Sequence, residues 1–82
     1  MEHRRAHIRL VRDNDVTTFV SLMNSDGTAM KYTLENFDGS HRVSARSLLG
    51  VMYFCADHND DTFLVNETED GVFPKGIDAF RI

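Results

Sequence analysis

The chain has 82 residues, of which 41% are hydrophobic and 27% charged, and its formal net charge at pH 7 is −4. This length predicts one small domain over residues 1–82. The acidic balance, without a basic stripe, excludes a typical nucleic-acid-binding protein. The first ten residues hold no apolar run long enough for a signal peptide or membrane span, and the one cysteine, Cys55, suits a reducing compartment. We therefore expect a cytoplasmic protein that contacts neither membrane nor nucleic acid.

A strand and then a helix are predicted for the first third of the chain. Ala6, Ile8 and Leu10 alternate with their neighbours at the period of a half-buried strand. Residues 13–15, D-N-D, can cap the helix that follows, because short side-chain oxygens accept orphan backbone N–H groups. Residues 24–27, N-S-D-G, end it with turn chemistry. The apolar stripe of this helix is Val16, Phe19, Val20 and Met23.

Two strands joined by a hairpin are predicted next. Residues 30–34, M-K-Y-T-L, alternate between apolar and polar and indicate a strand. The dipeptide D-G at residues 38–39 is a strong hairpin signal. The return strand is expected over residues 42–44.

The rest of the chain predicts a helix, a strand and a short terminal helix. Ser47 is well placed as the N-cap of the second helix. After a polar loop at residues 58–61, residues 62–66 indicate a fourth strand, and D-G at residues 70–71 turns the chain toward a terminal helix with Pro74 in its first turn. The expected core stripe of the second helix is Leu48, Val51, Met52 and Cys55. The terminal helix is expected to bury Phe73, Ile77 and Phe80.

The element order is therefore β-α-β-β-α-β-α. Two split β-α-β units with right-handed crossovers bury one side of a sheet under helices. We predict an α+β fold, an open-faced β-sandwich with a four-stranded antiparallel sheet and helices on one face.

Residues 43–51, V-S-A-R-S-L-L-G-V, run from a short strand through a serine into an apolar helix. The stretch resembles the regulatory-serine region of HPr, the phosphocarrier of the bacterial sugar phosphotransferase system, whose members read roughly V-x-A-K-S-[IL]-M-G-[VL]-M there. Residues 37–71 follow the HPr pattern in order, and residues 17–22 fit its first helix. The resemblance implies one HPr-like domain.

The resemblance also implies a phosphoryl relay, but the relay histidine is missing from its expected place in this chain. HPr carries a His-x-Arg motif just before its first helix, where helix N–H groups favour the phosphate. Arg12 and Asp13 stand at the corresponding place, and arginine stays protonated and is no nucleophile. The chain thus resembles a divergent member that is not competent in the relay. The alternative is a phosphocarrier with a displaced histidine, either His7 in the first strand or His41 beside the hairpin.

Ser47 matches the serine that a dedicated kinase modifies in HPr of many Gram-positive bacteria, after which the modified protein binds a transcriptional regulator. A phosphate on an N-cap meets the helix dipole favourably, and Arg46 can neutralise part of its charge. The other interpretation is that Ser47 is only a cap, worth about 1 kcal/mol.

Three apolar residues of the second helix, Leu48, Leu49 and Met52, match positions at which HPr proteins contact their partners. Leu48 and Met52 share one helical face, and Leu49 points about a hundred degrees away. We expect one of these faces in the core and the other as an exposed docking surface.

Catalytic and metal signatures are weak. No nucleophile–base pair, glycine-rich phosphate loop or catalytic carboxylate pair stands out, so we expect no enzymatic activity and no cofactor. Cys55 and His58 are spaced C-x-x-H without two further ligands, so no metal site is predicted. The sequence favours a regulatory or adaptor protein whose partner is a kinase, a transcriptional regulator or another protein. A plain protein-interaction domain on a shared small fold is the remaining alternative.

Overall fold

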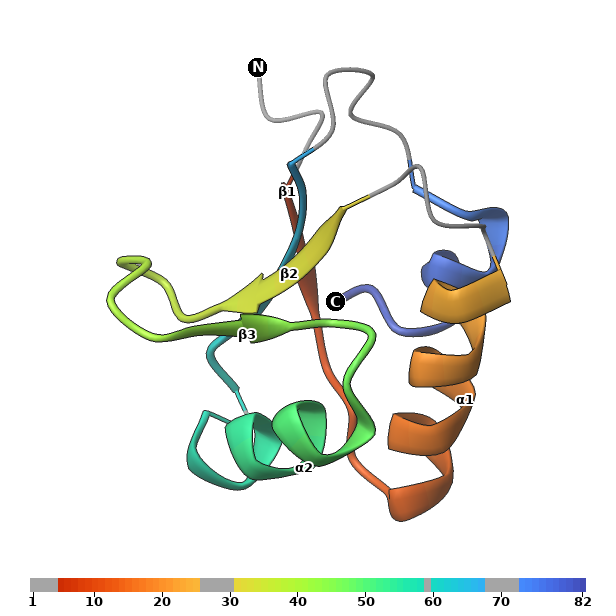
Figure 1. Ribbon diagram of the computed structural model, residues 1–82, viewed down its shortest axis with the longest axis horizontal. Coiled ribbons are helices and arrows are strands. Elements are labelled where there is room, and N and C mark those ends of the chain that lie inside the picture. The colour runs from red at the N-terminus through yellow and green to blue at the C-terminus, as the bar shows by residue number, and fades with distance from the viewer. Residues whose placement is uncertain (1–4, 26–30, 59, 68–72) are drawn as a thin grey trace.

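The computed structural model describes residues 5–25, 31–58, 60–67 and 73–82. These residues form a four-stranded antiparallel sheet of order β1-β4-β2-β3, with two α-helices and a short 3-10 helix on one face (Figure 1). The predicted α+β open-faced sandwich is confirmed. The strands are Arg5–Ile8 (β1), Tyr32–Glu35 (β2), Arg42–Ser44 (β3) and Thr62–Asn66 (β4). The helices are Asp13–Ser25 (α1), Leu48–Asp57 (α2) and the 3-10 helix Lys75–Ala79 (η1).

The predicted alternation is kept in β1, where Ala6 and Ile8 are buried and alternate with the half-buried Arg5 and His7. It is lost in β2, where Tyr32, Thr33 and Leu34 are all buried. Of the turn expected at residues 24–27, Asn24 and Ser25 still belong to α1, and residues 26–27 lie outside the described residues, as do Met30 and the turn expected at residues 70–71. The register places Ile8 opposite Thr62, while Leu34 lies opposite Leu64.

The core lies between the sheet and the helices. The stripe predicted for α1 is buried as expected, and its Phe19 ring meets Phe80 edge-on with ring centroids 5.9 Å apart. Ile77 of η1 is buried in the same core, whereas Phe73, which precedes η1, is half-buried. Pro74 is the N-cap of η1 with extended backbone, so its predicted place inside the first turn was wrong by one residue.

The core face of α2 differs from the prediction. Val51 and Phe54 are fully buried, whereas Leu48 and Met52 are exposed and Cys55 is only half-buried. Phe54 was missed, although it stands three residues after Val51 and therefore shares its face. Because Phe54 is the largest buried side chain of the helix, its burial turns Leu48 and Met52 outward.

Local polar contacts fix the ends of the elements. The Asp15 carboxylate accepts hydrogen bonds from the N–H groups of Val11 and Arg12, both at 3.1 Å. The predicted polar cap is therefore present, and it binds N–H groups that precede the helix. The hairpin turn holds Gly39 at a φ of 74°, a left-handed conformation that glycine adopts without strain. Asp38 accepts a hydrogen bond from the N–H of Ser40 at 3.0 Å.

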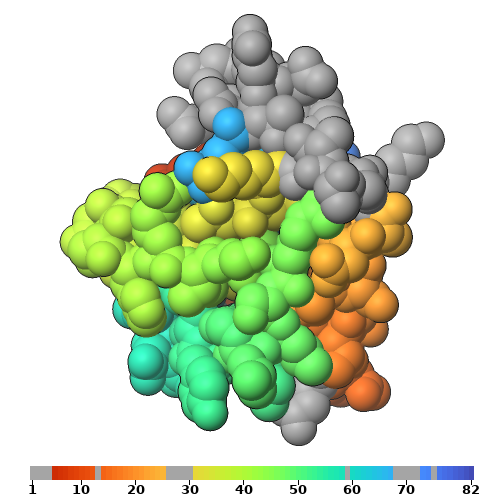
Figure 2. Space-filling model, in the orientation of Figure 1, coloured from red at the N-terminus to blue at the C-terminus, as the bar shows by residue number. Residues whose placement is uncertain are grey.

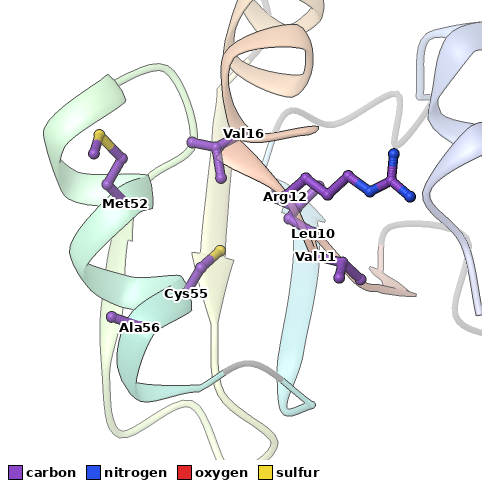
Figure 3. A pocket seen from close by; sticks show the side chains of 7 residues that line it. All are labelled: Leu10, Val11, Arg12, Val16, Met52, Cys55 and Ala56. Carbon is purple, nitrogen blue, oxygen red and sulfur yellow. The ribbon is translucent and has the colours of Figure 1, made fainter. Parts of the chain in front are cut away.

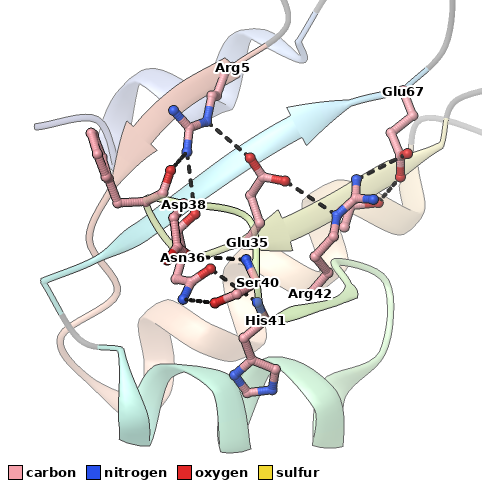
Figure 4. Close-up of polar contacts among 10 residues, drawn as sticks. Arg5, Glu35, Asn36, Asp38, Ser40, His41, Arg42 and Glu67 are labelled. Atoms are coloured by element: carbon pink, nitrogen blue, oxygen red, sulfur yellow. Dashed lines mark hydrogen bonds and ion pairs between the residues drawn. The ribbon is translucent and has the colours of Figure 1, made fainter.

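The open face of the sheet is covered by paired charges (Figure 4). Glu35 lies 3.1 Å from Arg5 and 3.2 Å from Arg42, and Arg42 also pairs with Glu67 at 3.1 Å. The Arg5 guanidinium stacks over the Phe63 ring at 4.1 Å. The charged side chains on this face therefore pair with one another.

The C-terminal residues lie along the β1 edge of the sheet. The C-terminal residues add a bridge between Ile8 and Arg81, and the N–H of Ile82 donates to the carbonyl of His7 at 3.0 Å. The outer edge of β1 is therefore paired.

No helix among the described residues is long and apolar enough to cross a membrane.

Candidate functional site

Four large apolar side chains of α2 face solvent. Leu49 and Tyr53 are 64% and 73% exposed, and Leu48 and Met52 are 42% and 45% exposed. We call these four residues the α2 patch. The expectation that one of the two faces, Leu48 with Met52 or Leu49, lies in the core was wrong, because Val51 and Phe54 occupy the core face. The result is a helix that is apolar on its inner and outer sides, which is typical of a contact surface.

A groove of about 330 Å³ adjoins the α2 patch. It is lined by residues 10–12 and Val16 on one side and by Met52, Cys55 and Ala56 of α2 on the other (Figure 3). α1 and α2 contact each other, and in Figure 2 the green and teal atoms of α2 lie beside the orange atoms of α1. The structure thus brings the relay-equivalent turn and the expected docking helix together around one groove.

Ser47 is the N-cap of α2, as predicted. Its backbone is extended, with φ −94° and ψ 114°, and its Oγ accepts a hydrogen bond from the N–H of Gly50 at 3.2 Å. A Cβ at Gly50 would lie 3.2 Å from that Oγ and 3.3 Å from the Ser47 Cβ. Close packing against the cap therefore explains a glycine inside this helix. The Ser47 side chain is exposed and accessible to a modifying enzyme.

Arg46 is tied to the neighbouring elements. Its guanidinium lies 5.7 Å from the centre of the Tyr32 ring, and its carbonyl accepts a hydrogen bond from Asn24 at 3.2 Å. Its own N–H donates to the Ser44 Oγ at 3.2 Å. The positive charge thus stands one residue before Ser47 but packs on β2.

The N–H groups of the turn before α1 are bound by a carboxylate of the protein itself. Arg12 directly precedes α1, and in Figure 3 its side chain extends away from α2. The Asp15 carboxylate accepts the N–H groups of Val11 and Arg12, the kind of donors that would bind a phosphoryl group. A second anion at this turn would meet a negative charge already in place. The side chain of Asp13 lies outside the described part.

The two alternative histidines contact other side chains and a loop carbonyl. His7 stacks on Phe63 with ring centroids 4.5 Å apart, and its Nε2 lies 3.2 Å from the carbonyl oxygen of Asp60. The His41 Nδ1 lies 2.8 Å from the Nε2 of His58, the C-cap of α2. The C-terminal end of a helix carries partial negative charge and disfavours a phosphoryl group.

Cys55 is the thiol of the groove. Burial raises its pKa to about 11, so it stays protonated near neutral pH and is a poor nucleophile. Among the described residues, no set of three or more His, Cys, Asp or Glu side chains could hold a metal ion.

Comparison with models of known families, with curated proteins and with solved structures gives no match to this chain. The resemblance to HPr therefore stays a hypothesis that depends on the sequence motif alone. The residues quoted for it belong to α1, the hairpin, β3, α2 and β4, and the exposure of Tyr53 on α2 was not predicted.

Proposed function

We propose that this chain is a non-enzymatic regulatory or adaptor protein of the HPr-like type, which binds a protein partner through the α2 patch and does not relay phosphoryl groups on histidine. The observation that carries the proposal is the exposure of four large apolar side chains on one helix. Full burial of an exposed side chain of this kind contributes about 1.5–3 kcal/mol, so a partner that covers the patch gains most at Leu49 and Tyr53 and less at Leu48 and Met52, which are 42% and 45% exposed.

The partner is a regulatory protein that presents apolar side chains beside arginine or lysine. The apolar part covers the α2 patch, and the cations pair with a phosphate on Ser47. Ser47 and the patch are adjacent, because Leu48 and Leu49 follow the serine directly. One partner surface therefore contacts the phosphate on Ser47 and the α2 patch together.

Phosphorylation at Ser47 is compatible with an intact helix. The hydroxyl oxygen forms a bond to the γ-phosphorus of ATP, ADP leaves, and the hydroxyl proton passes to solvent. The new phosphate oxygens take over as acceptors for the N–H groups of the first turn, and the helix dipole stabilises their charge. Modification thus adds charge beside the patch without removing the cap.

The absence of a relay follows from the turn before α1. Arg12 stands where the family carries its histidine, and the Asp15 carboxylate already accepts the local N–H groups. Like charges in one site repel each other, so a phosphoryl donor is disfavoured there.

The test is intact-mass analysis of two reactions. Incubation with ATP and the HPr serine kinase is expected to add one acid-stable phosphoryl group of about 80 Da. Ser47→Ala is expected to abolish this gain, whereas the matched variant Ser44→Ala, at a nearby exposed serine, keeps it. Incubation with phosphoenolpyruvate and the first phosphotransferase enzyme is expected to add nothing. An acid-labile gain in that reaction would make the chain a carrier and overturn the proposal.

A further inference from the structure

Two imidazoles meet on the surface at the C-terminal end of α2. The His41 Nδ1 and His58 Nε2 atoms are 2.8 Å apart, with ring centroids at 4.9 Å and an angle of 64° between the ring planes. Both rings pack against Phe54, at 5.2 Å for His41 and 4.7 Å for His58. In Figure 4 the His41 side chain points from the hairpin toward α2.

The backbone holds both histidines in place. The N–H of His58 donates to the carbonyl of Phe54 at 2.8 Å, and its own carbonyl accepts the N–H of Asp61 at 3.0 Å. The carbonyl of His41 accepts the N–H of Asn36 at 3.2 Å, and its N–H donates to the Asn36 side chain at 3.1 Å. The backbone of both residues is therefore fixed before any ligand arrives, and binding requires only that the two rings turn.

We propose that His41 and His58 form a two-imidazole site for a divalent copper ion. The facing nitrogens share a hydrogen bond at 2.8 Å, so the two rings are close enough for one ion to bind both once that bond is broken. Metal–nitrogen bonds of about 2.0 Å at right angles require two ligand nitrogens about 2.8 Å apart, a spacing within reach of the two rings. Imidazole suits copper, and copper leads the affinity order of the first-row divalent ions.

The protons balance within the two rings. Each neutral imidazole carries one N–H, and the hydrogen between the facing nitrogens moves through solvent to the far nitrogen of its own ring. The rings turn so that both lone pairs converge on the metal ion. Waters complete the coordination, since the described residues supply no third ligand of the His, Cys, Asp or Glu type.

The site joins two segments that are distant in sequence. His41 belongs to the hairpin between β2 and β3, and His58 ends α2, so bound copper cross-links the hairpin to the helix. The pair stands at the opposite end of α2 from Ser47. The proposed copper site and the proposed phosphorylation site therefore use different residues.

The test is a copper titration of tag-free protein followed by calorimetry and electron paramagnetic resonance. All proteins carry His3→Ala, which leaves three of the four histidines. We expect one bound copper ion, a tetragonal spectrum with two nitrogen couplings, and a rise in unfolding temperature. His41→Gln and His58→Gln are each expected to weaken binding roughly tenfold or more, because the second ligand no longer acts intramolecularly. The matched control His7→Gln keeps the affinity.

Three results would overturn the site: no bound copper, a spectrum without two imidazole couplings, or equal affinity in the pair variants and the parent. The spectrum of the parent decides the matter even if a variant fails to fold. Circular dichroism without metal checks the fold of each variant.

Discussion

The rotation of α2 about its own axis decides which residues form the core and which form the α2 patch. Phe54 is fully buried, whereas Met52 is 45% exposed. Phe54→Ala removes a whole buried ring, and we expect the free energy of unfolding to fall by about 3–5 kcal/mol. Met52→Ala removes a side chain that already contacts water, and we expect a loss below about 1 kcal/mol.

Urea unfolding followed by circular dichroism measures both losses. A chain of this length is stabilised by roughly 4–12 kcal/mol, so Phe54→Ala leaves little margin. Phe54→Leu, with an expected cost of about 1–1.5 kcal/mol, provides a milder measurement of the same site. Equal losses for Met52→Ala and Phe54→Ala would refute the assignment of the core face and, with it, the α2 patch.

Three further variants or conditions test local features of the structure. Gly50→Ala is expected to miss the usual gain of about 1 kcal/mol in helix stability, because its Cβ crowds Ser47; a full gain in urea unfolding would contradict this. The hydrogen bond from Thr33 lowers the pKa of the Glu67 carboxyl in the folded protein. The ionised carboxylate therefore adds to the free energy of unfolding above its unfolded pKa, and this stabilisation is lost as the pH falls through its folded pKa. Glu67→Gln should therefore flatten the acid limb of a stability–pH profile, and an unchanged limb would argue against the bond. Cys55, with its pKa raised to about 11, should react with iodoacetamide far more slowly at pH 7.5 than a free thiol, as followed by mass spectrometry; equal rates would contradict its burial.

Local patterns in the sequence predicted most of the fold. The alternation in β1 and the stripe of α1 each have one apolar side, so their buried faces could be read directly. The cap at Ser47 and the glycine turn at Gly39 depend on neighbouring residues only, and both are present.

The orientation of α2 could not be read in this way. Its sequence, L-L-G-V-M-Y-F-C-A-D, is apolar on all sides, so its periodicity favours no single face. Phe54 decides the orientation by packing into the core between the sheet and the helices, where its ring also meets His41 of the hairpin. Contacts over such sequence separations leave no local signal, and the histidine pair was missed for the same reason.

The α2 patch is the central claim, and its most direct test is binding of the transcriptional regulator that serine-phosphorylated HPr recognises. Calorimetry compares the Ser47-phosphorylated chain with its Leu49→Asp and Ile82→Asp variants, since Leu49 and Ile82 are 64% and 63% exposed. We predict that Leu49→Asp weakens binding by about 2 kcal/mol, roughly thirtyfold, while Ile82→Asp has no effect. Absent binding, or equal affinity of the Leu49→Asp variant and the parent, would contradict the account.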